Sequence, residues 1–417
     1  MRLLINSFLY GLSSVANAAI PFILLPLLTK LLSREELGIV SLWESIFLAA
    51  LPVVCFGING AINVEYFRRT PSEFRQYVAS ALGIPLACAM MLLPIAIPCA
   101  ILASPLLNIP PVWILGVIPL ALLGTYRLSL LSIWQARGSA IQFGVFQLLT
   151  SILNLGVSYV FVLHFDYDWE GRGLGIAAGF GISGLVAFFL LASQAMVFRK
   201  PRIEYIRSAF QIGAPLVPHA IAMMVILFVD RFFLSTFHDL ATVGIYVVAF
   251  QISAAITVLG NAMNQAWTPQ IFKHLSENSK GGDSSTVKIS LLFIAILVAA
   301  FVVLILSIPA IFQWLIGPEF QAAASLVPAL AASFLLAATY KPFVNVIFFE
   351  RQTKLLMYIA LITTSASVLA NLILVPSFGA QGAVAASLLA NICLTGCTII
   401  AAQRVRSLPW LELIRKN

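Results

Sequence analysis

Long apolar runs recur along the whole chain, and they constrain its fold more than any other feature. A run of about 20 apolar residues is long enough to cross a bilayer as a helix. Charged residues, prolines and glycines divide the 417-residue sequence into twelve such runs. The predicted spans lie at 8–32, 37–62, 76–104, 112–135, 141–164, 174–198, 210–236, 243–271, 288–312, 322–349, 355–375 and 383–402.

Charged residues are too few for a soluble protein. Asp, Glu, Lys and Arg make up 10% of the chain, whereas soluble globular proteins average about 25%. The fold class we predict is an all-α integral membrane protein whose spans leave no room for a large soluble domain, so catalysis by a separate soluble module is excluded.

The sequence contains no phosphate loop, paired metal ligands or nucleophile triad, and we expect no catalytic residue, metal or organic cofactor. Basic clusters interleaved with aromatic residues are absent too, so we expect no nucleic-acid partner.

The distribution of Lys and Arg predicts the orientation. Of 24 such residues, 18 fall in the termini and loops on one side, three (Lys30, Arg34 and Arg172) on the other, and three within spans. Because cytoplasmic loops carry the excess of Lys and Arg, both termini are predicted to be cytoplasmic.

The basic, proline-containing stretch 198–204 lies midway, with six spans on each side. We therefore predict two six-helix bundles, residues 1–203 and 204–417. Six is an even number, so the second bundle enters the membrane in the orientation of the first, and the bundles would be related by a pseudo-two-fold axis along the membrane normal. A faint repeat supports this, since Leu122–Arg127 corresponds to Leu336–Lys341 at an offset of 214 residues.

Arg127 and Lys341 are the first candidates for a binding site. A charge in the middle of a membrane costs at least about 2.5–3.5 kcal/mol, so such residues are functional candidates by default. Both lie ten residues before a loop cation, which places them at one depth near the bilayer centre. Two cations related by pseudo-symmetry suit an anionic ligand between the bundles. The alternative is that each side chain reaches the interface or pairs with a carboxylate.

Glu44 and Asp230 are candidates for ion coupling. Each carboxylate is predicted about 10 Å below the outer face, where it could bind and release a proton or cation as its access to water changes. His219 precedes Asp230 by three helical turns and could relay a proton. The alternatives are salt bridges for the carboxylates and a packed, hydrogen-bonded role for the histidine.

Polar residues at helical spacing predict which spans meet water. Asn17 belongs to such a stripe in the first span, and Asn261, Asn264 and Gln265 lie in the span 243–271. Spans 1, 2, 7 and 8 are therefore expected to line a hydrated cavity, with hydrogen bonds between helices as the alternative. Gly173–Ala178 nearly matches a dinucleotide-binding motif, but no strand precedes it, so Gly175 and Gly179 predict close helix packing instead.

Three segments carry a family resemblance: Leu27–Gly38 at the end of the first span, Val229–Leu234, and Val243–Tyr246. With the twelve spans in two halves, they make the chain resemble the O-antigen and polysaccharide flippases (Wzx type) of the multidrug/oligosaccharidyl-lipid/polysaccharide exporter superfamily.

The resemblance implies a V-shaped transporter in the bacterial cytoplasmic (inner) membrane. Such a protein would move undecaprenyl-diphosphate-linked oligosaccharide to the periplasmic leaflet by alternating access, driven by H⁺ or Na⁺ exchange. Cavity cations would hold the diphosphate and sugar acids, a role that the resemblance assigns here to Arg127 and Lys341 and extends to Lys30 and Arg231. The implied partners are the lipid-linked oligosaccharide, membrane lipids, a polysaccharide polymerase and a chain-length regulator.

Three rival functions stay open. An exporter of organic cations in the same superfamily would need a cavity dominated by carboxylates, whereas three of the five charges predicted within spans are positive. A membrane-embedded polysaccharide polymerase or ligase would need a large outer loop, which this sequence lacks. Flippases of lipid-linked peptidoglycan precursors resemble this chain in chemistry but have fourteen spans.

Overall fold

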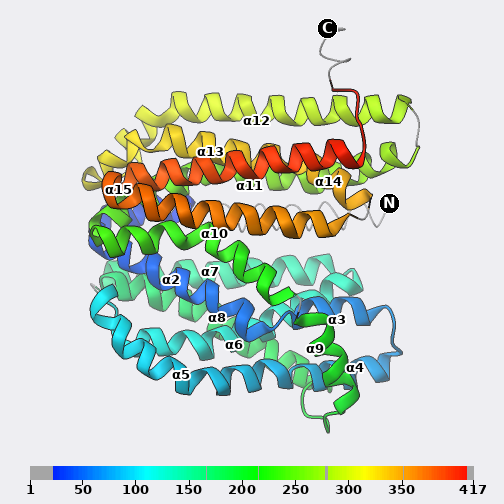
Figure 1. Cartoon of the computed structure of the whole chain (residues 1–417). Coiled ribbons are helices and arrows are strands. Elements are labelled where there is room, and N and C mark those ends of the chain that lie inside the picture. The colour runs from blue at the N-terminus through cyan, green and yellow to red at the C-terminus, as the bar shows by residue number, and fades with distance from the viewer. Residues whose placement is uncertain (1–21, 166, 215, 278–279, 351, 411–417) are drawn as a thin grey trace. The chain divides into compact units, whose positions relative to one another are not determined.

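The computed structural model describes residues 22–165, 167–214, 216–277, 280–350 and 352–410, and their regular structure is helical (Figure 1). A short apolar helix, Phe22–Leu31, comes first. The others are α2 (Arg34–Cys55), α3 (Ile58–Tyr66), α4 (Pro71–Ala81), α5 (Gly83–Leu107), α6 (Pro111–Arg137), α7 (Ala140–His164), α8 (Trp169–Ser193), α9 (Ile203–Gly213), α10 (Leu216–Phe237), α11 (Leu240–Ser276), α12 (Lys280–Trp314), the 3₁₀ helix η1 (Pro318–Ser325), α13 (Val327–Thr339), α14 (Lys341–Phe349) and α15 (Thr353–Val405).

The chain forms two compact units. The first takes in Glu35–Phe228, and the second takes in the stretch that ends at Arg34 together with the chain from Val229 onward. By their contacts the units therefore divide within α10. The bundle boundary at 203/204 and the pseudo-two-fold axis stay predictions from the sequence.

Within the described residues, ten helices are long and apolar enough to cross a membrane. The prediction of a multi-pass all-α membrane protein is confirmed, but the count is ten where the sequence predicted twelve. Two features account for the difference. Much of the span 8–32 lies outside the described residues. The spans 355–375 and 383–402 are two helices joined across a kink at Gly379 (φ 56°, ψ −132°) and are counted together as α15.

In the first unit, α8 packs against both α6 and α7, and α9 packs against α3 and α4. Apolar residues from these helices form a core that includes Ile62, Tyr77 and Leu130, each fully enclosed. By contrast, α5 exposes most of its apolar side chains, such as Met91 at 73% and Leu106 at 76%. A helix this apolar with so little of its surface packed against protein is suited to contact lipid.

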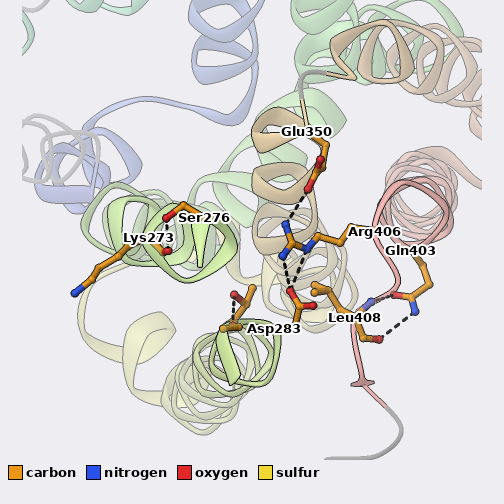
Figure 2. Close-up of polar contacts among 9 residues, drawn as sticks. Lys273, Ser276, Asp283, Glu350, Gln403, Arg406 and Leu408 are labelled. Atoms are coloured by element: carbon orange, nitrogen blue, oxygen red, sulfur yellow. Dashed lines mark hydrogen bonds and ion pairs between the residues drawn. The ribbon is translucent and has the colours of Figure 1, made fainter. Parts of the chain in front are cut away.

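In the second unit, α13 packs between α11 and α15, and α14 packs against both of those helices. An ion cluster ties three helix ends together (Figure 2). The guanidinium of Arg406, just after α15, contacts Asp283 Oδ1 of α12 at 2.8 Å and Glu350 Oε1, just after α14, at 2.9 Å. Because one planar guanidinium serves two carboxylates, the ends of α12, α14 and α15 are held in one arrangement.

Candidate functional site

Arg127 lies inside α6 of the first unit, as the sequence predicted. Its guanidinium carbon is 5.1 Å from the centroid of the Phe180 ring, which is a cation–π contact. Its Nε is buried and has no hydrogen-bond partner among the described residues. A buried donor of a charged group without a partner is costly, and a ligand that supplied an acceptor would remove that cost.

Arg172 is a buried cation within a helix, so its predicted place in a loop before the span 174–198 is wrong, while the side of the membrane on which it lies stays a prediction. The residue lies within the first turn of α8 and is 8% exposed. One guanidinium nitrogen donates to Asn154 Oδ1 at 2.5 Å and to Ser158 Oγ at 3.0 Å, both on α7. Glu44 of α2 is close enough to interact electrostatically with it. The two charges attract each other within one unit, but no ion pair joins them in the described part of the chain, so the salt-bridge alternative for Glu44 stays a prediction.

Close packing of α7 on α8 brings these groups together, as the glycine spacing predicted. A Cβ added at Gly175 would lie 2.7 Å from the Asn154 carbonyl oxygen and 2.8 Å from the Ser158 nitrogen. Only a residue without a side chain allows that approach. Arg172, Gly175 and Gly179 are spaced by three and four residues and so share one helix face. That register is the signal that could have identified Arg172 as a buried residue.

Asp230 and Arg231 are buried in the second unit, at 4% and 6% exposure. Asp230 accepts a hydrogen bond from the hydroxyl of Tyr246 on α11 through Oδ2, and one from the backbone nitrogen of Arg231 at 2.9 Å through Oδ1. The Arg231 guanidinium lies over the Phe250 ring at 4.7 Å from its centroid. The two charges stand out in the sequence, whereas nothing in it marks Tyr246 as the partner of Asp230.

Lys341 is the first residue of α14, at a break in the span predicted for 322–349. Pro342 follows it and cannot donate the backbone hydrogen bond that would continue α13. The Lys341 ammonium is half-buried, 5.3 Å from the centroid of the Tyr340 ring. One turn later, Asn345 donates to Asn264 Oδ1 at 2.9 Å and to Thr268 Oγ1 at 3.3 Å. Asn264 thus takes part in a hydrogen-bond network between α11 and α14, which was the alternative to a water-lining role.

The remaining predicted residues are more exposed or lie outside the described part of the chain. Lys30 is exposed at the end of Phe22–Leu31, and Asn261 and Gln265 are exposed on α11. His219 belongs to α10, but its side chain is outside the described residues, as is Asn17 altogether.

Two sets of charges that are at least partly buried result. The first unit holds Arg127 and, apart from it, Glu44 with Arg172. The second unit holds Asp230 with Arg231 and, at a helix break, Lys341. Among the described residues, no group of three or more His, Cys, Asp or Glu side chains could hold a metal ion. The site that the sequence predicts between Arg127 and Lys341 joins residues of different units and stays a prediction.

The helical fold and its buried charges define a multi-pass integral membrane protein. The chain belongs to the polysaccharide biosynthesis protein family, which its residues 3–275 match.

Two proteins of Haemophilus influenzae are relatives. A protein of the Lsg locus is 21% identical over 375 residues, covering 87% of this chain and 89% of its own. An uncharacterized membrane protein is 21% identical over 374 residues, covering 87% of this chain and 88% of its own.

Solved structures share the fold. An inward-facing multidrug resistance MATE family transporter of the MOP superfamily is similar at a TM-score of 0.70, with 13% identity, over 98% of this chain and 99% of that one. The lipid II flippase MurJ, in an inward closed conformation, is similar at a TM-score of 0.70, with 12% identity, over 96% of this chain and 87% of that one. The chain therefore has the fold of the MOP superfamily transporters.

Proposed function

We propose that this protein is a flippase of the Wzx type, which moves a lipid-diphosphate-linked oligosaccharide across the bacterial inner membrane by alternating access. Membership of the polysaccharide biosynthesis family supports the substrate class. The fold shared with the lipid II flippase MurJ and with a multidrug transporter supports translocation as the activity. The proposal keeps both termini in the cytoplasm, on the distribution of Lys and Arg.

The buried Nε of Arg127, which has no hydrogen-bond partner among the described residues, is the observation that carries the choice of an anionic substrate. A diphosphate presents several strong acceptor oxygens, and arginine binds phosphate with short, charge-assisted hydrogen bonds. Lys341, at a helix break in the other unit, is proposed as the second cation of the site. Lys30 and Arg231 are proposed as auxiliary cations, although Lys30 is exposed and Arg231 already stacks on Phe250.

Asp230 is the carboxylate that we propose for coupling to H⁺ or Na⁺. It is buried on α10 and accepts a hydrogen bond from the hydroxyl of Tyr246. A carboxylate in such a site can be neutralised by a proton or a cation and can release it when the surroundings change. Glu44 is a weaker candidate because of its interaction with Arg172. His219, which precedes Asp230 on α10, remains the proposed relay.

The test is translocation in inverted membrane vesicles from cells that lack their own flippase. A lipid-diphosphate oligosaccharide is supplied to the exposed leaflet, an ion gradient is imposed, and protection of the sugar from an added glycosidase is followed over time. We expect protection only in vesicles that contain this protein. The variants are Arg127→Gln and Lys341→Gln, with Arg137→Gln and Lys354→Gln as controls, since both control residues are exposed cations.

A multidrug exporter is the second candidate, because one of the two structures with a TM-score of 0.70 is a multidrug resistance transporter. Uptake of organic cations into the same inverted vesicles, without protection of the oligosaccharide, would establish that function and contradict ours. A polymerase or ligase would instead lengthen or transfer the oligosaccharide, which analysis of the recovered lipid detects.

A further inference from the structure

The outward face of α9 combines large apolar side chains with a cation. Ile203 is 76% exposed, Phe210 is 50% exposed, and Arg207 between them is also exposed. Their spacing of four and three residues places all three on one side of the helix. Phe210 stacks on Phe56 with 4.9 Å between the ring centroids, yet half of its side chain stays exposed, and most of Ile203 is exposed too. Exposed apolar side chains flanking a cation mark a candidate contact surface.

The opposite face of α9 is fixed to the protein. Tyr205 and Ala209 are buried, and Tyr205 packs with Tyr77 of α4 at 5.8 Å between ring centroids. The chain before α9 is held too, because the Arg202 nitrogen donates to Ser80 Oγ at 3.1 Å. The orientation of α9 is therefore set, so Ile203, Arg207 and the exposed half of Phe210 face away from the protein.

The surroundings of this face are strongly cationic. Residues 65–80 and 198–213, which we call the α4–α9 corner, contain seven Lys or Arg residues against three Glu residues. Two of the three carboxylates are already engaged: Glu65 accepts from Arg69 Nε at 2.5 Å, and Glu73 accepts from the Thr70 nitrogen at 3.1 Å at the start of α4. The outward-facing cations are exposed: Arg68, Arg75, Lys200, Arg202 and Arg207.

We propose that the α4–α9 corner is a binding surface for anionic phospholipid headgroups of the leaflet in which it lies. Cations on an interfacial helix are attracted to lipid phosphates, while apolar side chains on the same face enter the boundary of the acyl chains. An acidic protein surface or a nucleic acid would pair with the charge of Arg207 but would not cover the apolar side chains of Ile203 and Phe210. A lipid surface offers phosphate and hydrocarbon within a few ångströms of each other. The position of α9 directly before the spanning helix α10 agrees with a place at the interface.

The experiment measures lipid binding to the purified full-length protein in detergent by native mass spectrometry. The probes are phosphatidylglycerol and phosphatidylcholine with identical acyl chains. We expect the protein to prefer phosphatidylglycerol. The triple variant Arg75→Gln/Lys200→Gln/Arg207→Gln should lose at least about tenfold in phosphatidylglycerol affinity, since each cation near an anionic surface contributes roughly a fivefold factor. The charge-conserving Arg207→Lys should keep the affinity of the unmodified protein.

A matched triple variant of the second unit, Lys273→Gln/Lys354→Gln/Arg404→Gln, removes the same charge from three other exposed positions. It should keep its phosphatidylglycerol affinity within about twofold. The pair Ile203→Ser/Phe210→Ser keeps every charge and should also weaken phosphatidylglycerol binding, which separates this surface from a purely electrostatic one.

Three results would overturn the proposal: equal binding of the two lipids, equal losses in both triple variants, or an unchanged affinity when the corner cations are removed. The last result would leave a protein partner as the occupant of this face. Lipid binding does not require translocation, so the outcome is independent of the proposed flippase activity.

Discussion

Tyr246 donates its phenolic hydroxyl to Oδ2 of Asp230, and both side chains are enclosed within the second unit. The contact joins α10 to α11 across sixteen residues of sequence. It gives the buried carboxylate a neutral donor in addition to the neighbouring charge of Arg231. A carboxylate held by a neutral donor keeps its geometry whether or not a proton or cation joins it, which suits a coupling site.

Tyr246→Phe should destabilise the protein by about 1–3 kcal/mol, because it leaves a buried carboxylate oxygen with one donor fewer. A thermal unfolding curve in detergent measures this loss. Tyr358→Phe is the control, since Tyr358 is 56% exposed and removal of its hydroxyl should shift the curve little. An equal shift in both variants would show that the contact with Asp230 contributes nothing.

Arg127→Gln and Lys341→Gln should each reduce translocation of a lipid-diphosphate oligosaccharide by at least about tenfold, with insertion into the membrane unchanged. The physical reason is the loss of a charge-assisted hydrogen bond to phosphate in a poorly hydrated site, worth about 1.5–3 kcal/mol. Initial rates in inverted vesicles measure the effect. Normal rates in both variants would remove these two residues from the proposed site.

Gly175→Ala should destabilise the first unit by about 1–3 kcal/mol or more, because the added Cβ would overlap the Asn154 carbonyl oxygen and the Ser158 nitrogen of α7. Gly181→Ala, on the same helix, is the control. Its added Cβ meets Leu120 at 3.7 Å, an ordinary contact, and alanine favours the helix by up to about 1 kcal/mol. Melting temperatures of the two variants should therefore move in opposite directions.

Asp239 should make the stability of the second unit depend on pH. It caps α11 by accepting a hydrogen bond from the Thr242 nitrogen at 2.6 Å. Hydrogen bonds from Thr242 lower the pKa of Asp239 below its ordinary value. The pKa of Asp239 is thus lower in the folded than in the unfolded protein. The cap therefore contributes its full stability at pH values above the unfolded-state pKa of about 3.9. This contribution is lost as the pH falls through the folded-state pKa.

The measurement is the difference in melting temperature between the unmodified protein and Asp239→Ala. At pH 7 the variant should be less stable by about 0.5–1 kcal/mol, as for other exposed helix caps, and the difference should vanish at pH values below both pKa values. Asp239→Asn should stay close to the unmodified protein at pH 7, because asparagine caps helices equally well, and the contribution of its cap should not depend on pH.

The membrane class, the helical fold and the close packing at Gly175 could be predicted from the sequence, because hydrophobic run length and glycine spacing are local properties. The burial of Arg172 could not be predicted by counting loop cations. Its position depends on how closely α7 approaches α8, and hydropathy places the start of that span at residue 174, five residues after α8 begins at Trp169. The pairing of Asn264 with Asn345 depends similarly on the packing of two helices, because the two residues are 81 positions apart in the sequence.

Tyr246 shows a further limit. From the sequence, its hydroxyl could line a cavity, contact lipid headgroups or donate to a buried carboxylate. Only the three-dimensional structure identifies Asp230 as its partner. The charged residues Asp230 and Arg231 were easier to identify, since charge within an apolar run is conspicuous in the sequence.

The sharp reversal at Gly379 has a consequence for biosynthesis. Gly382 lies so close to the chain before the turn that an added Cβ would be 2.3 Å from the Leu374 carbonyl oxygen, so the two arms of α15 fold back on each other with almost no linker (Figure 1). Because only a few residues join the two arms, neither arm can lie far from the other once both are in the bilayer. We therefore expect the last two spans to insert together, as a helical hairpin.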